Sequence, residues 1–172
     1  KLEASATGIE FNNELKESDS LNVLDISNIY NGGGVGIGDF NGDSLADIYF
    51  TGNKVSNKLY LNKGALHFED ITSVAGVEGE GKWSRGVSVV DINNDGKSDI
   101  YISATLGTDT TLRKNILYIN QGNDEKGVPH FKNLAAEYGL ADTSFSTNTR
   151  LLSLSRDITS PQIEQLMGWS CS

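Results

Sequence analysis

The chain contains little cysteine, little proline and no long apolar run. A single cysteine, Cys171, excludes an internal disulfide framework and a cysteine-rich zinc site. No apolar run approaches the roughly 18 residues that a membrane-spanning helix needs. No signal-type segment opens the sequence, although a cleaved signal would leave no trace in it.

Basic residues are scarce relative to acidic ones. There are 14 Lys and Arg against 23 Asp and Glu, which gives a net charge of −9 at pH 7. This balance argues against nucleic acid as a partner, because phosphates require clustered Lys and Arg. Six of the 23 acidic residues lie in two short loops. The acidity is therefore better explained by metal ligands than by a surface for basic partners.

Glycine is abundant, and the strand-forming residues occur in short runs. The 172 residues include 19 glycines against two prolines, and the glycines often fall between runs of Val, Ile, Tyr and Phe. A hydrophobic content of 37% is enough for a folded core. The pattern predicts an all-β protein of short strands joined by tight turns.

Two nine-residue loops, 52 residues apart, follow the pattern D-x-N-x-D-x-x-x-D. Oxygen ligands at positions 1, 3, 5, 7 (by its backbone carbonyl) and 9 suit Ca²⁺, which takes about six to eight oxygens. Two Ca²⁺ sites are therefore predicted. The first set is Asp39, Asn41, Asp43, the carbonyl of Leu45, and Asp47; the second is Asp91, Asn93, Asp95, the carbonyl of Lys97, and Asp99.

Neither loop is an EF-hand, and the two are not expected to bind equally. The Glu that closes an EF-hand at position 12 is replaced by Phe50 in one loop and Ile102 in the other, and strand-like sequence flanks both. Position 6 needs a residue that tolerates a left-handed backbone. Gly96 meets this need in the second loop, whereas Ser44 stands in the first. Weaker binding is therefore predicted at the first loop.

Sequence around the two loops is similar, which indicates a structural repeat. Asp47-Ile-Tyr matches Asp99-Ile-Tyr, and Asn57-Lys-Leu-Tyr-Leu-Asn matches Asn115-Ile-Leu-Tyr-Ile-Asn. Four short strands per unit are predicted, in the first unit near residues 33–38, 47–52, 56–61 and 67–72. Four-stranded units at a period of about 50 residues are typical of β-propeller blades. Two blades are assigned, to residues 30–82 and 83–140.

The remaining segments are less regular. Residues 1–29 precede the first blade, and Gly8-Ile-Glu-Phe11 in them resembles an outer strand of an adjoining blade. Residues 141–172 are expected to begin a third repeat and end in an atypical tail, because residues 149–172 contain no D-x-[ND]-x-D. Two blades and the start of a third make an incomplete propeller, since rings need about four to eight blades. The chain is therefore expected to be a fragment or to end in a shifted reading frame.

With Gly34-Val-Gly-Ile-Gly-Asp39 leading into the first loop and Val87-Ser-Val-Val-Asp91 into the second, the chain resembles the FG-GAP/VCBS repeat family. The resemblance covers roughly residues 30 to 148. It implies a β-propeller like that of the integrin α-subunit, Ca²⁺ at the loop positions named above, and no catalytic residues. The approach to the first loop is most similar to extracellular bacterial members, often surface lipoproteins.

These observations predict an extracytoplasmic, secreted or cell-surface module that binds or adheres to a glycan or protein, with structural Ca²⁺. The alternative is an accessory propeller region of a secreted polysaccharide-degrading enzyme whose catalytic part is absent. We expect no enzyme activity, because the two histidines, His67 and His130, occupy matching repeat positions without a nucleophile beside them in sequence. Open blade edges are expected to favour self-association.

Overall fold

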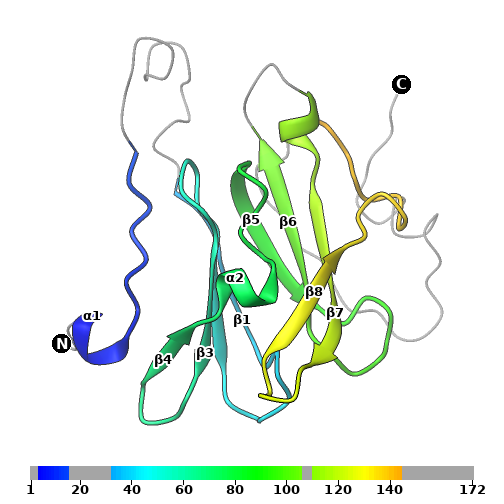
Figure 1. The fold of residues 1–172 in the computed structure, drawn as a ribbon. Helices are drawn as coiled ribbons and strands as arrows, with labels where there is room; N and C mark the ends of the chain where they lie inside the picture. Colours follow the sequence, from blue (N-terminus) through cyan, green and yellow to red (C-terminus); the bar gives the residue numbers. More distant parts are fainter. Residues whose placement is uncertain (1–3, 16–31, 106–109, 145–172) are drawn as a thin grey trace.

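The computed structural model describes residues 4–15, 32–105 and 110–144, which contain two four-stranded antiparallel sheets (Figure 1). The strand orders are β1-β2-β3-β4 and β5-β6-β7-β8, so each sheet is a simple meander. The first sheet consists of β1 (Val35–Gly38), β2 (Asp47–Phe50), β3 (Lys58–Asn62) and β4 (Phe68–Asp70). The second sheet consists of β5 (Trp83–Val90), β6 (Asp99–Thr105), β7 (Ile116–Asn123) and β8 (Pro129–Asn133).

The predicted all-β fold of four-stranded blades is confirmed. The observed strands of the first sheet lie within the predicted runs, or extend one residue beyond them. The pairing register repeats between the sheets: Ile48 faces Tyr60 across β2 and β3, and Ile100 faces Tyr118 across β6 and β7. Equivalent residues of the repeat therefore occupy equivalent places, as expected for propeller blades.

The main core lies between the two sheets. One cluster of buried residues joins Tyr49, Leu59 and Leu61 of the first sheet to Ile100 and Ile102 of the second. At β1 the contact is unusually close, because Gly36 and Gly38 lie directly against the second sheet. A Cβ on either glycine would come within 3.0 Å of a Val89 methyl group. Glycine at these positions therefore lets β5 pack on the backbone of β1.

A second core cluster covers the opposite face of the second sheet. It contains Tyr101, Leu117 and Ile119, with Ala135 and Leu140 from the segment that follows β8. Tyr101, Leu117 and Ile119 are the repeat equivalents of Tyr49, Leu59 and Leu61, which face the second sheet from the first. Equivalent faces of the two sheets therefore point in the same direction along the stack: that of the first sheet contacts the second sheet, and that of the second contacts the segment after β8.

The helices are short. They are α1 (Ala4–Thr7), α2 (Thr72–Ala75) and the 3-10 helix η1 (Thr110–Arg113), so no described helix is long enough to span a membrane. Residues 8–11, expected as an outer strand, do not pair as one. They follow α1, which Gly8 ends at a φ of +78°. The predicted start of a third repeat beyond residue 144 lies outside the described residues.

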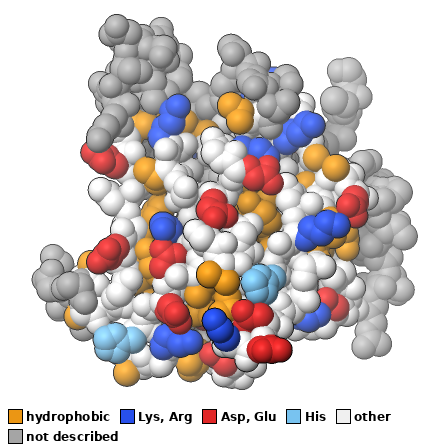
Figure 2. All heavy atoms as spheres, viewed as in Figure 1, with side chains coloured by type: hydrophobic (Ala, Val, Ile, Leu, Met, Phe, Trp, Pro, Cys, Tyr) orange, Lys and Arg blue, Asp and Glu red, His pale blue; other side chains and the backbone are white. Residues whose placement is uncertain are grey.

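The face shown in Figure 2 carries interspersed acidic and basic side chains rather than a single-sign field. The described residues include exposed ion pairs, such as Lys58 with Asp70 and Lys63 with Glu69. Six further acidic side chains lie in the two aspartate loops, to which the structure gives matching positions.

Candidate functional site: two aspartate loops

The two aspartate loops join equivalent strands. The first loop (residues 39–47) connects β1 to β2, and the second loop (residues 91–99) connects β5 to β6. The final aspartate of each loop is also the first residue of the next strand. All ten predicted ligand residues therefore lie in two equivalent turns, one per sheet.

Both loops are organised around their first aspartate. In the first loop a carboxylate oxygen of Asp39 accepts hydrogen bonds from the amides of Gly42 (2.7 Å) and Asp43 (3.2 Å), and the other oxygen accepts one from Ser44 (2.8 Å). In the second loop Asp91 accepts equivalent bonds from Asp95 (3.0 Å) and Gly96 (2.8 Å). The chain thus wraps around this carboxylate in both turns.

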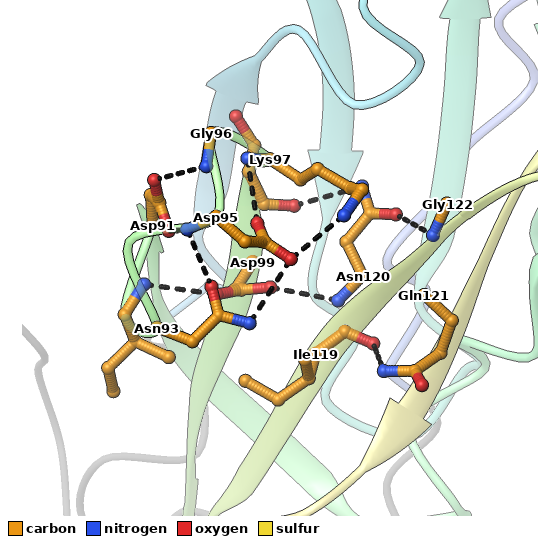
Figure 3. A network of polar contacts seen from close by, with 12 residues as sticks. Asp91, Asn93, Asp95, Gly96, Lys97, Asp99, Ile119, Asn120, Gln121 and Gly122 are labelled. Atoms are coloured by element: carbon orange, nitrogen blue, oxygen red, sulfur yellow. Dashed lines mark hydrogen bonds and ion pairs between the residues drawn. The ribbon is translucent and has the colours of Figure 1, made fainter.

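The middle ligands repeat the same geometry (Figure 3 shows the second loop). The Asn41 side chain donates to Asp43 at 3.0 Å, and the Asn93 side chain donates to Asp95 at 3.2 Å. Asp43 accepts from the Leu45 amide at 2.8 Å, and Asp95 from the Lys97 amide at 2.9 Å. Positions 1, 3, 5 and 7 of the two loops therefore share one hydrogen-bonded framework.

The last aspartate of each loop is fully buried. Asp47 accepts hydrogen bonds from the amides of Phe40 (2.9 Å) and Asn62 (2.8 Å). Asp99 accepts them from Ile92 (3.0 Å) and Asn120 (2.8 Å). Each carboxylate therefore links the start of its own loop to the third strand of its sheet.

The pKa values of these two carboxyls are raised mainly by burial, and the other aspartates of each loop add to the effect. Burial raises the pKa of Asp47, the two backbone amides lower it, and the charges of Asp43 and Asp39 raise it. Burial likewise raises the pKa of Asp99, with the same opposing amides and with added repulsion from Asp95 and Asp91. A cation in either loop would oppose this repulsion.

Sequence reasoning missed two asparagines that support the loops. Asn62 and Asn120 end the matching Asn-x-Leu-Tyr-x-Asn segments, and each gives its backbone amide to the buried aspartate. Each also donates its side-chain amide to the carbonyl just before that aspartate, at Ala46 (3.0 Å) or Ser98 (3.3 Å). Their matching place at the end of the Asn-x-Leu-Tyr-x-Asn segments was the signal that could have identified them, although the second unit has six more residues between loop and asparagine.

The first loop has additional support from the second sheet. The Asn120 side chain donates to the carbonyl of Phe40 at 2.8 Å, and the Asn123 side chain donates to that of Asn41 at 2.7 Å. Asn120 therefore contacts the backbone of the first loop while its own amide holds Asp99 of the second. No hydrogen bond among the described residues gives the second loop a comparable support from another sheet.

Each loop contains two left-handed residues, at positions 4 and 6. In the first loop these are Gly42 and Ser44, with φ values of 77° and 67°. In the second they are Asn94 and Gly96, with φ values of 61° and 83°. The predicted left-handed position 6 is confirmed. Position 4 was not anticipated, and there the glycine is in the first loop rather than the second.

The second loop also contains a cation of its own. The Lys97 ammonium lies 2.9 Å from a carboxylate oxygen of Asp95, and this contact, first among the causes, lowers the pKa of Asp95. The equivalent residue of the first loop is Leu45. A metal ion at the second loop would therefore compete with a lysine that the first loop lacks.

The carboxylate, amide and carbonyl oxygens of the two loops are ligands that a hard cation prefers. In this structure the carboxylates accept hydrogen bonds from backbone amides. In the described ranges, no three His, Cys, Asp or Glu side chains converge closely enough to be recognised as a metal cluster. The oxygens of each loop nevertheless belong to one short turn. An ionised carboxylate accepts hydrogen bonds or metal ions at about four lone-pair sites. An oxygen that accepts one donor retains capacity for a cation, whereas one oxygen of Asp39 and one of Asp95 each accept two donors and would have to give one up. The donor types are those that Ca²⁺ takes.

Comparison with known proteins places this region among repeat proteins. Residues 39–102 match the family model described as an FG-GAP-like repeat, a span that begins at the first aspartate loop and includes the second. Cartilage acidic protein 1 of Xenopus tropicalis is 39% identical over 74 residues, which is 42% of this chain and 11% of that protein. The Homo sapiens protein of the same name is 39% identical over 72 residues, or 41% of this chain and 11% of that protein.

The aligned part thus spans about a tenth of the relatives' length. The match to the family model agrees with the repeated strands, loops and hydrogen bonds described above. Residues 39–102 of this chain therefore resemble an FG-GAP-like repeat, and the two four-stranded antiparallel sheets to which they contribute have the form of propeller blades.

Proposed function

We propose that this chain is a calcium-binding segment of an extracellular β-propeller and that it serves as a binding or adhesion module. The observation that carries the proposal is the duplication of the loops. Two turns on adjacent blades keep the same oxygen donors and the same hydrogen-bonded framework, including a buried aspartate in each. A turn that needed only to reverse the chain would not require three carboxylates.

Calcium is favoured over magnesium by the ligand types. The donors are carboxylate, amide and carbonyl oxygens on a loop, and Ca²⁺ accepts six to eight such ligands at about 2.3–2.6 Å in flexible geometry. Magnesium demands near-octahedral geometry and keeps several waters. In the first loop Asp39, Asn41, Asp43, Leu45 and Asp47 would hold the ion, and in the second Asp91, Asn93, Asp95, Lys97 and Asp99.

The role proposed for the metal is structural. A bound divalent ion supplies positive charge that offsets the repulsion among the three carboxylates of a loop. The protein's own groups fix the turn: Asp39 or Asp91 gathers the loop amides, and the buried Asp47 or Asp99 connects the loop to the third strand. The blade edge is thereby made rigid, which suits a surface that binds a partner rather than a catalytic centre.

The histidines do not support catalysis. His130 lies 3.5 Å from Asp124 in the turn between β7 and β8. His67 follows the turn after β3, where its amide donates to the carbonyl of Gly64 at 2.9 Å. Both belong to equivalent hairpins of the repeat, so their positions follow the scaffold. We accordingly propose no enzyme activity for this part of the protein.

An extracellular location follows from the strength expected of such loops. Sites without a bidentate glutamate should bind Ca²⁺ with dissociation constants on the order of 10⁻⁴–10⁻³ M, as in extracellular modules. Such sites fill where free calcium is millimolar, and they stay largely empty in the cytosol. FG-GAP repeats also typically occur in extracellular proteins.

The proposal is tested by calcium titration of the chain. Isothermal titration calorimetry should detect two sites of millimolar or submillimolar affinity, and 5–10 mM CaCl₂ (an order-of-magnitude range set by those affinities) should raise the melting temperature more than MgCl₂ does. Asp39→Asn and Asp91→Asn should each remove one site, whereas Glu137→Gln, at an exposed acid that belongs to neither loop, should remove neither. Absence of calcium binding in the wild-type chain would contradict the metal assignment.

The binding role requires a separate test. The chain is applied to glycan and protein arrays in calcium and again after chelation with EDTA. Calcium-dependent retention without turnover of any glycan would support a binding module. Hydrolysis of a polysaccharide by the purified chain would instead favour the alternative of an accessory region of a polysaccharide-degrading enzyme, and it would overturn the assignment as a non-enzyme.

A further inference from the structure

The N-terminal segment has a counterpart after the first sheet. Ala4-Ser-Ala-Thr-Gly-Ile-Glu10 aligns without gaps with Thr72-Ser-Val-Ala-Gly-Val-Glu78, with Ser, Gly and Glu identical. Both stretches form a four-residue helix, α1 or α2, that ends at a left-handed glycine. The glycine amide donates to the first helical carbonyl in both, at 3.1 Å for Gly8 and 3.0 Å for Gly76.

The two stretches also occupy the same place on the sheet that follows each of them. Gly8 lies against the carbonyl oxygen of Phe68 in β4, and Gly76 lies near that of Phe131 in β8. Phe68 and Phe131 are equivalent residues of the repeat. The α2 segment is the end of the first repeat unit, and it packs on the second sheet in this way.

A second pair of contacts repeats at the neighbouring strand. The amide of Glu10 donates to the Tyr60 hydroxyl at 3.3 Å, and the amide of Gly79, one position further along the alignment, donates to the Tyr118 hydroxyl at 3.2 Å. Tyr60 and Tyr118 are again repeat equivalents. The N-terminal segment continues over the first sheet, where Phe11 stacks on Phe50 with ring centroids 5.0 Å apart. Figure 1 shows this segment in blue on the side of the first sheet away from the second.

On the outer face of the first sheet, the side chains of β1 lack, among the described residues, the packing that their equivalents on β5 have. On β5, Val87 and Val89 pack against the glycines of β1. The equivalent side chains on β1, Val35 and Ile37, point to the outer face and are 56% and 64% exposed. They are among the most exposed large hydrophobic residues of the described chain. Exposed apolar surface of this kind is typical of an interaction site.

We propose that the outer face of the first sheet is an interface for a further four-stranded unit of the same repeat, and that residues 4–13 are the closing segment of that unit. The occupant is defined by the contact already present between the two sheets. Its inner strand must carry small residues, as Gly34, Gly36 and Gly38 do in β1, so that Val35 and Ile37 can pack against its backbone.

The direct test extends the chain by one unit. A copy of residues 33–71 is placed immediately before Ala4, so that its fourth strand runs into α1 as β4 runs into α2. Ile37→Cys in the original copy, in a Cys171→Ser background, then reports exposure by its rate of maleimide labelling. We expect labelling to slow at least tenfold in the extended chain relative to the unextended one. Equal labelling rates in two folded proteins would overturn the proposal.

A matched variant shows whether the glycine face is responsible. Gly36→Val and Gly38→Val are introduced only in the added copy, where they would collide with Val35 and Ile37 of the original sheet. Protection of Ile37→Cys should then be lost, while the original two sheets stay unchanged. Continued protection would mean that the added unit covers the face in another way, contrary to the proposal.

Two measurements on the unextended chain keep the proposal testable if the extended chain does not fold. Hydrogen exchange should show the Glu10 amide protected and Tyr60→Phe should release it, in parallel with Gly79 and Tyr118→Phe. Free exchange of Glu10 would overturn the assignment of residues 4–13. Sedimentation tests a second copy as occupant: a dimer that Ile37→Lys dissociates would also overturn the proposal.

Discussion

The first and second aspartate loops share one framework but differ in how they are supported. The first loop is held by the second sheet, through Asn120 and Asn123 on the carbonyls of Phe40 and Asn41. The second loop has within itself a lysine, Lys97, paired with one of its carboxylates. Identical ligand patterns in a repeat therefore do not imply identical sites, because each loop has different neighbours.

Four differences act in opposite directions on the relative calcium affinities. The left-handed Ser44 disfavours the first loop, since a non-glycine residue there costs roughly 1–2 kcal/mol. The left-handed Asn94 costs the second loop less, because asparagine adopts this conformation more readily. Lys97 disfavours the second loop, and support from the second sheet favours the first. The prediction of a weaker first loop rested on Ser44 alone.

Removing the buried aspartates should have the largest effect on stability. Asp47→Ala and Asp99→Ala each leave two backbone amides without an acceptor in a buried place, which should cost about 3 kcal/mol or more. Asp99→Ala should cost more, because it also releases the strand residue Asn120 that supports the other loop. Urea denaturation in EDTA measures both, with Glu137→Gln as control. Equal, small losses would show that these carboxylates do not organise the loops.

The asparagines provide a sharper comparison. Asn62→Ala removes one side-chain donor to its own loop, whereas Asn120→Ala removes donors to both loops. Each change also removes the acceptor of one turn amide, that of Gly64 or Gly122, so we expect free-energy losses of about 2 and 3 kcal/mol respectively, at about 1 kcal/mol for each hydrogen bond. Asn120→Ala should also weaken calcium binding at the first loop, from which it is distant in sequence. Calorimetry in an Asp91→Asn background isolates that loop, and an unchanged affinity there would show that the two loops are independent.

The parts of this site that were predictable from sequence are local. The spacing of Asp39, Asn41 and Asp43 fixes the turn, and the alternation in Asp47-Ile-Tyr fixes the strand, because both depend on residues a few positions apart. The equivalence of the two units was also visible, since the same residue types recur at the same offsets. Strand positions and loop placement followed from these patterns.

The long-range contacts were not predictable in the same way. The bond from Asn120 to Phe40 joins residues 80 positions apart, and its existence depends on how one sheet packs against the other. Gly8-Ile-Glu was compared with a strand because its apolar pattern is compatible with one. The likeness of residues 4–10 to residues 72–78 was visible in the sequence, but that both stretches form a short helix ended by a left-handed glycine is known only from the structure.

Relieving backbone strain should improve the first loop more than the second. Ser44→Gly should raise the free energy of unfolding by about 0.5–1 kcal/mol, since the relief of left-handed strain exceeds the entropy cost of glycine. Asn94→Gly should change it by less than about 0.5 kcal/mol, because asparagine is only mildly strained there. Ser44→Gly should also raise calcium affinity at the first loop. The absence of any gain in calorimetry would show that Ser44 is not what limits that loop.

Exchanging the residue at position 7 should give the smallest effect. The pair of Lys97 with Asp95 is partly exposed, with side chains 43% and 32% accessible, and exposed pairs contribute about 0.2–1 kcal/mol. Lys97→Leu should therefore raise calcium affinity at the second loop by a factor of about 1.4 to 5, measured in low salt in an Asp39→Asn background. Leu45→Lys should lower affinity at the first loop to a similar degree. Position 7 is expected to ligate only through its carbonyl. Opposite changes in calcium affinity in the two variants would therefore assign the difference between the loops to side-chain charge. Changes in the same direction would assign it to the backbone of the turn.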